Sequence, residues 1–327
     1  MRASWYERNG AAADVLVHGE RETPEPGVGE VRVRLAVAGV NPADVKRRSG
    51  VGGRTMRHAL IVPGDDGAGV VDKVGPRVPE HRVGQRVWVH SANHFSPFGT
   101  AAQYVVVPAT QAVELPDGVP LDVGACLGVP AMTAHRCLFA DGPIDGLTVL
   151  VTGGAGAVSH YAVEMAKQGG ATVIATASTP EKQAAARAAG ADHVLDHREP
   201  DIAARILDLA PGGAERVVDV AFGANLPLTS RLVAPNGTIA SYASDSVPEP
   251  VLPFYTLMRK GITIRTVLMF TMPPWALRAA TEHVTRLLGA GALTHPIAAS
   301  FPLDDLAGAH AHVESGQAIG KVIVRIP

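Results

Sequence analysis

The fold of this chain is decided by Val149-Leu150-Val151-Thr152-Gly153-Gly154-Ala155-Gly156-Ala157-Val158-Ser159. The first four residues are apolar or β-branched, which is typical of a strand that is covered on both faces. Glycines follow at once, and apolar side chains then recur at helical spacing until Gly169-Gly170 ends the helix. A second β-rich run covers residues 172–177. The pattern predicts a βαβ unit with a tight glycine turn between its first strand and its helix.

Such a turn suits the pyrophosphate of a dinucleotide. Its glycines let backbone N–H groups approach the phosphates, and the helix N-terminus adds partial positive charge. The spacing is G-x-x-G-x-x-S on Gly153, Gly156 and Ser159, and serine is small enough to let the helix pack on the strand. The alternative is a βα turn whose glycines serve the backbone geometry alone. We predict that the pyrophosphate is held by Gly153, Gly154, Ala155, Gly156, Ala157 and Val158.

Strand and helix patterns alternate around this unit. The predicted strands cover residues 147–152, 172–177, 194–195, 216–221, 237–242 and 263–270. The predicted helices cover residues 121–139 with an interruption at Pro130, then 157–168, 180–189, 201–210, 226–234 and 274–288. Six strands separated by helices predict an α/β fold with a doubly wound parallel sheet.

The two ends of the chain differ in composition and pattern from the region of alternating strands and helices between them. Residues 1 to about 120 are rich in Gly, Pro and Val, and residues 30–37 alternate at period two, as a half-buried strand does. Residues 298–327 return to this style. We therefore predict a β domain of residues 1–122 plus 298–327, into which a nucleotide-binding domain of residues 123–297 is inserted. The cleft between two such domains is the expected place for a substrate.

Composition excludes several classes of protein. The balance of 29 basic and 31 acidic residues indicates neither a nucleic-acid partner nor a membrane surface, and no apolar run reaches transmembrane length. Charges at Arg2, Glu7 and Arg8 argue against a signal peptide. Cys126 and Cys137 lie in an apolar helical stretch, at a spacing that disfavours a disulfide between them. We interpret them as core thiols in a reducing cytoplasm, with a catalytic cysteine as the alternative.

The end of the second predicted strand bears on the choice of nucleotide. An NAD site usually has an acidic residue there that holds the ribose 2′-hydroxyl. This strand is followed by Ser178, Thr179 and Lys182 without such an acid, and a hydroxyl with an ammonium favours a 2′-phosphate, hence NADPH. Ser178 and Glu181 also have the spacing of a helix capping box, with Pro180 in the first turn. Capping and phosphate binding can coexist.

Several short runs in a fixed order carry a family resemblance. They are AGVNPAD at 38–44, PGDDGAGVV at 63–71, VGQRV at 83–87, GTAAQYV at 99–105, PAMTA at 130–134, the glycine turn, GAD at 190–192 and GKV at 320–322. With these runs the chain resembles the medium-chain dehydrogenases/reductases over nearly its whole length, in the zinc-free quinone oxidoreductase branch that includes zeta-crystallin. The resemblance implies a GroES-like catalytic domain around a Rossmann domain, NADPH as cofactor and a dimer.

The resemblance also implies roles for single residues. Asn41 would lie near the nicotinamide ribose and Thr133 at the nicotinamide end, while a turn residue before Pro42 is the alternative for Asn41. Lys321 would close the site from the last segment. The other implied cofactor contacts are Ser178, Lys182 and His197 at the 2′-phosphate, and Phe222, Ser241 and Tyr242 at strand C-termini that face the cofactor.

Zinc is tested by the residues at its expected ligand positions. A catalytic zinc needs about three protein ligands of the His, Cys or carboxylate type. In the alcohol dehydrogenase branch the first cysteine ligand aligns with Asn41 and the His-Glu pair aligns with Asp65-Asp66, so neither a thiolate nor an imidazole is offered there. His90 and His94 have i,i+4 spacing in a loop-like segment, and we interpret them as surface or cleft histidines. No metal is predicted.

Without a metal, hydride transfer to a quinone or an enone needs only a hydrogen-bond donor or water beside the negative oxygen. Asn41 and Lys46 are the catalytic candidates, although Lys46 is also readily explained as a solvated lysine, and some quinone reductases of the branch carry tyrosines where Lys46 and Gly52 stand. The sequence predicts an NADPH-dependent quinone oxidoreductase. The alternatives are an NADPH-dependent reductase of α,β-unsaturated carbonyls, and a cofactor-binding structural or regulatory protein with little turnover.

Two further segments have open interpretations. His90, His94, Phe95 and Phe270 are candidate substrate contacts, and residues 94–98 would form either a lid or a surface loop. Residues 266–270 are apolar enough to line the cleft or to form an interface between edge strands. We favour the interface, and so predict a homodimer whose sheets join edge to edge.

Overall fold

The structure is a computed structural model that describes residues 1–94 and 96–327. The chain forms two compact units. The first, here called the β unit, comprises Met1–Val129, Thr281–Ala290 and His295–Pro327. The second, here called the α/β unit, comprises Pro130–Ala280 and Gly291–Thr294.

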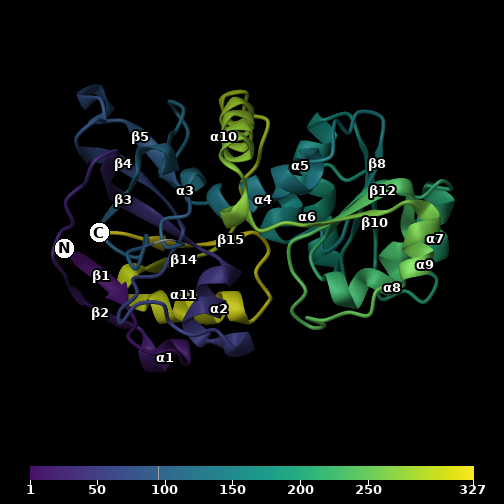
Figure 1. The fold of residues 1–327 in the computed structure, drawn as a ribbon, viewed down its shortest axis with the longest axis horizontal. Coiled ribbons are helices and arrows are strands. Elements are labelled where there is room, and N and C mark those ends of the chain that lie inside the picture. Colours follow the sequence, from purple (N-terminus) through teal and green to yellow (C-terminus); the bar gives the residue numbers. More distant parts are fainter. Residues whose placement is uncertain (95) are drawn as a thin grey trace. The chain divides into compact units, whose positions relative to one another are not determined.

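The α/β unit is built on a six-stranded parallel sheet, whose strands run between helices in Figure 1. In chain order its strands are β8 (Thr148–Val151), β9 (Thr172–Thr176), β10 (His193–Leu195), β11 (Ala214–Asp219), β12 (Val233–Ser241) and β13 (Thr263–Thr266). Their spatial order is β10-β9-β8-β11-β12-β13, and every neighbouring pair is parallel. This is the doubly wound order in which the chain starts in the middle and reverses direction once. The predicted fold class is therefore confirmed.

Helices connect these strands. Most follow the predicted ranges, but the helix predicted to begin at residue 226 begins at Phe222, and the helix Phe254–Lys260 was not predicted. They are α4 (Gly128–Phe139), α5 (Ala157–Gln168), α6 (Pro180–Ala188), α7 (Ile202–Leu209), α8 (Phe222–Leu232), α9 (Phe254–Lys260) and α10 (Pro274–Gly289). One side of the sheet packs Leu150, Ile174 and Val217 against Ile202 and Ile206 of α7 in a fully apolar core. This packing fixes the carboxyl ends of the strands, where a nucleotide binds in folds of this kind.

Two predicted elements were wrong in extent. The predicted strand over residues 263–270 ends at Thr266, because β12, with which it pairs, ends at the partner residue Ser241, and a short 3-10 turn follows at Met269–Thr271. The predicted helix over residues 121–139 is two helices, α3 (Leu121–Gly124) and α4. Pro130 does not interrupt it, since it lies in the first turn of α4, where its missing N–H costs no hydrogen bond.

The β unit contains a mostly antiparallel sheet and a separate hairpin-like pair, β1 with β2. Its strands are β1 (Arg2–Trp5), β2 (Val17–Glu20), β3 (Glu30–Val40), β4 (Asp66–Val74), β5 (Arg86–Val89), β6 (Tyr104–Pro108), β7 (Ala112–Glu114), β14 (Ile297–Pro302) and β15 (Lys321–Arg325). Its helices include α1 (Ala12–Val15), α2 (Pro42–Ser49), α3 and α11 (Leu306–Glu314).

The last strand of the chain joins this sheet beside an early one. β15 pairs antiparallel with β3, with Val322 opposite Val40, and β14 pairs parallel with β15. Valines of β3, β4 and β5 alternate inward and share one core with Val324 of β15. A GroES-like β domain interrupted by a Rossmann sheet is thus the architecture that the sequence predicted.

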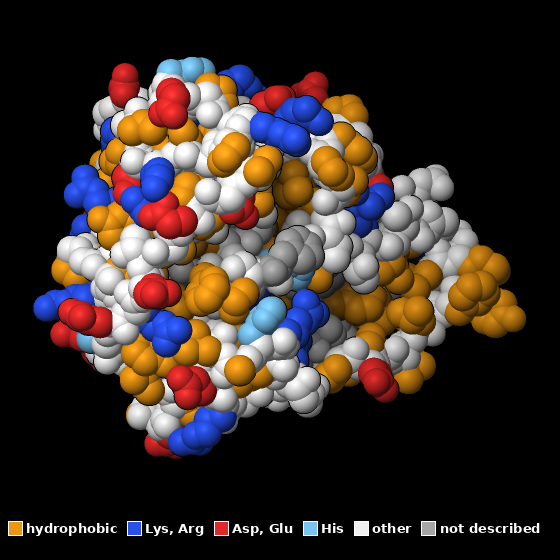
Figure 2. Space-filling view, turned by 60° about the vertical axis from the view of Figure 1, so that its left-hand side comes forward, with side chains coloured by type: hydrophobic (Ala, Val, Ile, Leu, Met, Phe, Trp, Pro, Cys, Tyr) orange, Lys and Arg blue, Asp and Glu red, His pale blue; other side chains and the backbone are white. Residues whose placement is uncertain are grey.

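The distribution of charged side chains on the surface agrees with the nearly equal numbers of acidic and basic residues in the sequence. Figure 2 shows acidic and basic side chains interspersed with hydrophobic ones over the face that it draws, as expected for 29 basic and 31 acidic residues. Within residues 1–94 and 96–327, no helix is long and apolar enough to cross a membrane.

Candidate functional site

The glycine turn leaves the N-terminus of α5 open. Gly153 adopts a left-handed conformation with φ 62°, and the next residue donates from its backbone N–H to the carbonyl of Thr176 on β9 at 2.8 Å. Gly156 is the N-cap residue of α5 and supplies no side chain to cap it. The backbone N–H groups of Ala157 and Val158 therefore have no acceptor within the helix, and they point with the positive end of the helix dipole toward an incoming anion.

Two neighbouring strands hold this turn in place. The Ser159 hydroxyl lies 3.0 Å from the carbonyl oxygen of Thr152, to which it donates, and 3.1 Å from the Tyr242 hydroxyl. Burial raises the pKa of Tyr242, so its phenol stays protonated. The Ser241 hydroxyl donates to the carbonyl of Asp219 at 3.0 Å. Tyr242 and Ser241, both predicted cofactor contacts, thus also brace the strand ends around the turn.

Asp219 is a buried carboxylate that the sequence pattern did not single out. It ends β11 and accepts hydrogen bonds from the Thr152 hydroxyl at 2.9 Å, from the Ala221 N–H at 3.0 Å and from the Asn225 amide at 2.7 Å. All three bonds go to Oδ1, and Oδ2 has no partner among the described residues. Asp219 therefore fixes the turns after β8 and β11 and keeps one acceptor oxygen. The signal in the sequence was a lone acid at the end of an apolar strand.

The loop after β9 carries the predicted 2′-phosphate contacts. Thr179 is the N-cap of α6, and its hydroxyl accepts from the Lys182 N–H at 3.3 Å. The proposed capping box from Ser178 was therefore wrong by one residue. The backbone of Thr179 has the extended N-cap conformation, whereas Ser178 precedes it. Ser178 is left half-buried on the loop, and Lys182 lies in the first turn of α6.

The turn after β10 adds an arginine to this rim. Arg198 lies next to the predicted contact His197, and its guanidinium donates to Asp196 through Nε at 3.0 Å and through Nη2 at 2.6 Å. Nη2 also donates to the carbonyl of Ser178. Arg198 holds the pKa of Asp196 at about 2, well below its usual range. Ser178, Lys182, His197 and Arg198 thus all lie at the carboxyl ends of β9 and β10.

In the β unit, Asn41 is hydrogen-bonded to both members of a buried ion pair, Lys321 and Asp66. Asn41 precedes α2, and its side-chain Nδ2 donates to Asp66 Oδ2 at 2.8 Å. The Lys321 ammonium donates to Asn41 Oδ1 at 2.5 Å and to Asp66 Oδ2 at 2.8 Å. All three residues are buried: Asn41 is 2% exposed, Lys321 3% and Asp66 0%. The structure therefore brings together Asn41 and Lys321, which were predicted separately as site residues, and adds Asp66 to them.

Glycines make the space for this ion pair. A Cβ atom on Gly39 would lie 2.7 Å from Lys321 Cε and 2.1 Å from the carbonyl oxygen of Ala125. A Cβ atom on Gly128 would lie 2.1 Å from Asp66 Oδ1, which accepts from the Val129 N–H at 2.9 Å. Burial raises the pKa of Asp66, and the Lys321 ammonium opposes this rise. The ammonium thus supports the ionised carboxylate that its burial disfavours.

The neighbouring carboxylate, Asp65, is paired separately. Arg47 of α2 contacts Asp65 and donates to Asp44 Oδ1 at 2.7 Å, and the Asn93 N–H donates to Asp65 Oδ1 at 3.2 Å. Burial raises the pKa of Asp65 to about 7, while Arg47 opposes the rise. Asp65 and Asp66 therefore each face a cationic side chain of the protein itself.

Other predicted residues lie outside these clusters. His90 is buried rather than on the surface, because it directly follows β5 and its ring lies 5.7 Å from that of Trp88, and burial lowers its pKa to about 4, which keeps it neutral. His94 is half-buried and Phe95 lies outside the described residues. The remaining candidates are Lys46 on α2, half-buried, Thr133 on α4, buried, Phe222 at the start of α8, and Phe270 in the turn after β13.

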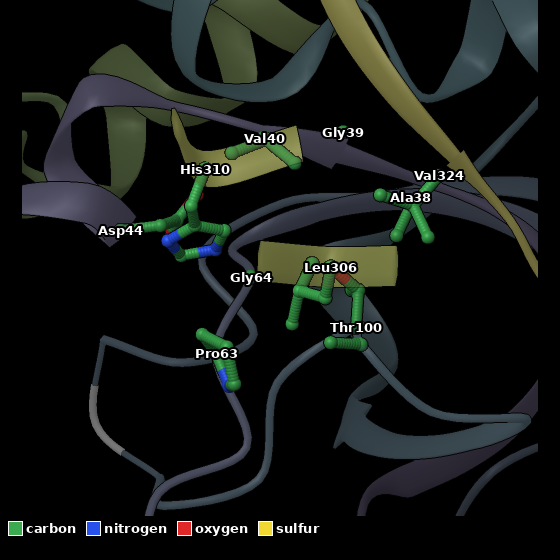
Figure 3. A pocket seen from close by; sticks show the side chains of 11 residues that line it. Ala38, Gly39, Val40, Asp44, Pro63, Gly64, Thr100, Leu306, His310 and Val324 are labelled. Atoms are coloured by element: carbon green, nitrogen blue, oxygen red, sulfur yellow. The ribbon is translucent and has the colours of Figure 1, made fainter. Parts of the chain in front are cut away.

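A small cavity in the β unit is too small for a substrate. It measures about 10 Å³ and is lined by residues of β3, by Asp44 of α2, by His310 of α11 and by Thr100 of the segment before β6, among others (Figure 3). This volume holds about one water molecule. Burial lowers the pKa of His310 to about 4, and its Nδ1 has no partner among the described residues. A neutral imidazole beside a water-sized space is a structural feature of the core.

Comparison with known proteins agrees with this architecture. Residues 27–117 match the alcohol dehydrogenase GroES-like domain, and residues 157–286 match the family described as zinc-binding dehydrogenase. A quinone oxidoreductase of Pseudomonas aeruginosa is 30% identical over 95% of both chains. A 2-haloacrylate reductase of a Burkholderia species is 30% identical over 99% of this chain and 98% of the relative.

Solved structures superpose on both units. A mycobacterial protein solved in complex with NADPH has a TM-score of 0.88 at 29% identity, covering 99% of this chain and 100% of the other. A structure described as an NAD-dependent alcohol dehydrogenase has a TM-score of 0.89 at 29% identity and covers both chains completely. The fold and the open helix N-terminus define a two-domain, dinucleotide-dependent oxidoreductase. The chain belongs to the quinone oxidoreductase branch of the medium-chain dehydrogenase/reductase superfamily.

Proposed function

We propose that this chain is an NADPH-dependent quinone oxidoreductase that works without zinc. In this proposal residues 1–122 with 298–327 form the catalytic domain and residues 123–297 form the NADPH-binding domain. The observation that carries it is the buried Lys321 ammonium between Asn41 and Asp66, which provides a fixed positive charge from the protein itself. Bound NADPH supplies the hydride.

The α/β unit offers groups that fit NADPH. The open N-terminus of α5 suits the pyrophosphate, since Gly156 leaves the first-turn N–H groups uncovered. The loop after β9 presents Ser178 and Lys182, and the turn after β10 presents His197, for the 2′-phosphate. The unpartnered Oδ2 of Asp219 is a buried acceptor for a hydroxyl or amide of the cofactor. The mycobacterial relative in complex with NADPH supports this assignment.

The residues at the expected zinc position do not fit a metal ion. Asp65 is engaged by Arg47 and by the Asn93 N–H, and Asp66 by Lys321, Asn41 and the Val129 N–H. A divalent cation there would face two cationic side chains, and positions 41, 65 and 66 offer neither a thiolate nor an imidazole. Among residues 1–94 and 96–327, no three His, Cys, Asp or Glu side chains are grouped so that they could share a metal ion. Zinc therefore has no part in the proposed reaction.

A quinone is a suitable acceptor for this arrangement. A quinone oxygen that gains negative charge needs a nearby donor or water but no Lewis acid. The Asn41 side-chain amide has two N–H groups. One donates a hydrogen bond to Asp66, and the other is left to donate to a substrate oxygen. Lys321 holds the amide in this orientation through its bond to Oδ1. Asn41 thereby remains the first catalytic candidate and Lys46 the second. His90, His94, Phe95 and Phe270 are kept as proposed substrate contacts.

The second candidate function is reduction of an α,β-unsaturated carbonyl. The similarity to a 2-haloacrylate reductase over nearly the whole chain favours it. The same donors would serve, because hydride addition to an enone also leaves negative charge on an oxygen. The third possibility, a cofactor-binding structural or regulatory protein, predicts NADPH binding without turnover.

We expect purified protein to oxidise NADPH rapidly when a quinone is offered, and more slowly when an enone is offered in parallel. NADH serves as the control cofactor. Prior dialysis against a strong zinc chelator should leave the rate unchanged, because no step uses a metal. Faster turnover of the enone would make the second candidate the function. NADPH binding with neither acceptor reduced would exclude both reductase activities, and loss of the rate after chelation would overturn the zinc-free proposal.

We also propose that the chain is a cytoplasmic enzyme that acts on a small molecule, with neither nucleic acid nor a membrane as a partner. Two observations support this part. Cys126 and Cys137 are both buried free thiols, and burial raises the pKa of each to about 12, so both stay unreactive. The chain carries 29 basic and 31 acidic residues, so its net charge does not favour a nucleic acid or an acidic membrane surface.

A homodimer through the free edge of the parallel sheet completes the proposal. β13 is the edge strand, and large apolar side chains near it are exposed: Leu252 50%, Phe254 63%, Tyr255 65%, Met258 53% and Leu268 52%. Exposed apolar side chains of this size are typical of a surface that another protein covers. An identical strand on a second copy would also satisfy the unpaired backbone groups of the edge.

This interface is tested by placing a charge on it. Leu268→Lys should convert a dimer into a monomer when mass is measured by light scattering during size-exclusion chromatography. The matched control is Leu209→Lys, since Leu209 is a similarly exposed leucine on α7 at 40%. The control should keep the wild-type mass. A wild-type monomer, or a Leu268→Lys variant that remains dimeric, would contradict the proposed interface.

A further inference from the structure

We infer that Arg198, clamped by Asp196, is the residue that makes the site prefer NADPH over NADH. This inference rests on the proposed cofactor function. It assigns a role to two residues of the turn after β10 that neither the sequence pattern nor the family resemblance had selected. The side chains form a charged pair beside the loop that carries Ser178.

The location of the pair follows from the sheet. β10 runs parallel to β9 with Leu195 opposite Thr176, and the Ala177 N–H donates to the Leu195 carbonyl at 2.9 Å. The turn after β10 is thereby held against the loop after β9. The Arg198 guanidinium closes the contact by donating to the Ser178 carbonyl. In doubly wound folds the loop after the second strand is where the ribose 2′ position is recognised.

Asp196 fixes the guanidinium in one orientation. Asp196 accepts from the Arg198 backbone N–H at 2.9 Å, from Nε at 3.0 Å and from Nη2 at 2.6 Å. These bonds and the Ser178 contact use the Nε and Nη2 donors, while the two protons of Nη1 have no partner in the described part of the chain. The side chain is 62% exposed, so these protons face solvent. A planar guanidinium with free donors is well suited to a phosphate.

The position of Asp196 indicates how the site would behave if Arg198 were removed. Asp196 would then be an unpaired carboxylate next to the loop that recognises the ribose. Such an acid repels a 2′-phosphate and accepts a hydrogen bond from a 2′-hydroxyl, which is the usual arrangement in NAD sites. Arg198 therefore has two effects: it attracts the phosphate, and it neutralises an acid that would otherwise favour NADH.

The test compares cofactor binding by wild type and by Arg198→Gln, which keeps a long polar side chain without the charge. Dissociation constants for NADPH and NADH are measured by titration calorimetry, and for 2′,5′-ADP and 5′-AMP as fragments with and without the 2′-phosphate. The ratio of NADPH to NADH affinity should fall by about fivefold or more, since a charge-assisted bond to phosphate is lost. A smaller change in that ratio would overturn the inference.

Two further variants separate the causes. Arg205→Gln is the matched control, because Arg205 also pairs with a carboxylate after β10, that of Glu199, and makes no contact with Ser178 that the structure shows. It should leave the ratio unchanged, and an equal fall would reduce the role of Arg198 to general surface charge. Asp196→Asn combined with Arg198→Gln should recover NADPH affinity by about threefold relative to Arg198→Gln alone, because the unpaired acid is gone. No recovery would refute the clamp.

These outcomes are distinct from failure of the proposed function. If wild-type protein binds neither NADPH nor 2′,5′-ADP, the proposed cofactor is wrong and the inference falls with it. If wild type binds NADPH in preference to NADH and Arg198→Gln keeps that preference, the cofactor stands and only the role of Arg198 is refuted.

Discussion

Lys321→Met is expected to lower the free energy of unfolding by about 3–5 kcal/mol, because it leaves the Asp66 carboxylate buried without its cation. Methionine has nearly the length of lysine, so the packing around Gly39 is kept and the change is chiefly one of charge. The measurement is urea-induced unfolding followed by circular dichroism at neutral pH. Lys73→Met is the matched control, since Lys73 pairs with Glu25 on the surface, and it should leave the unfolding curve almost unchanged.

The pH dependence of this loss has a definite sign. In the folded wild type, burial raises the pKa of Asp66 and Lys321 opposes the rise, so removing Lys321 raises it further. A carboxyl with a raised folded-state pKa stabilises the fold at pH values below its unfolded pKa of about 3.9 and loses that contribution as pH rises through the folded value. The deficit of Lys321→Met should therefore be smallest near pH 4 and should grow toward pH 8.

A second variant makes the charge argument refutable. Asp66→Asn combined with Lys321→Met removes both charges and should be more stable at pH 8 than Lys321→Met alone. Because asparagine does not titrate, the double variant should also lose less stability between pH 4 and pH 8 than Lys321→Met does. If the double variant were as unstable as the single one at every pH, lost packing rather than an unpaired carboxylate would be the cause.

The architecture was predictable because the spacing of apolar residues along the sequence indicates each strand and helix. Apolar residues at strand spacing, glycines and then helical spacing specify a βαβ unit wherever they occur, and the alternation of such segments leaves few topologies for the sheet. The doubly wound class of the sheet and the return of the last segment to the β domain followed from this pattern. The extent of β13 did not, because an apolar run does not reveal how many residues its neighbour offers for pairing.

The candidate site was predictable only in part, and the reason is again physical. Lys321 was assigned to the site by resemblance, but its partner Asp66 lies 255 residues away in the chain, and no local pattern reveals such a contact. Ser178 and Thr179 both fit the spacing of a helix cap, and only the backbone conformation selects Thr179. His90 was predicted to be a surface or cleft histidine because its segment is loop-like, yet it packs beside Trp88 with its imidazole buried.

Gly156→Asp is expected to weaken NADPH binding by about hundredfold or more without unfolding the protein. Gly156 has φ −72° and ψ 156°, which any residue adopts, and a Cβ atom there would meet only the Gly153 carbonyl oxygen at 3.5 Å. Aspartate is a preferred N-cap residue, so thermal stability should be unchanged or slightly higher. The same carboxylate would occupy the anion site at the N-terminus of α5 and repel the pyrophosphate.

The opposite directions of these two effects make the experiment informative. Dissociation constants come from titration calorimetry, and stability comes from thermal unfolding of the same samples. Gly156→Asn is the matched control, since asparagine has nearly the same shape, also caps helices and carries no charge. It should retain far more NADPH affinity than Gly156→Asp. Wild-type affinity in Gly156→Asp would show that the pyrophosphate binds elsewhere, and an equal loss in both variants would assign the effect to space rather than to charge at this helix N-terminus.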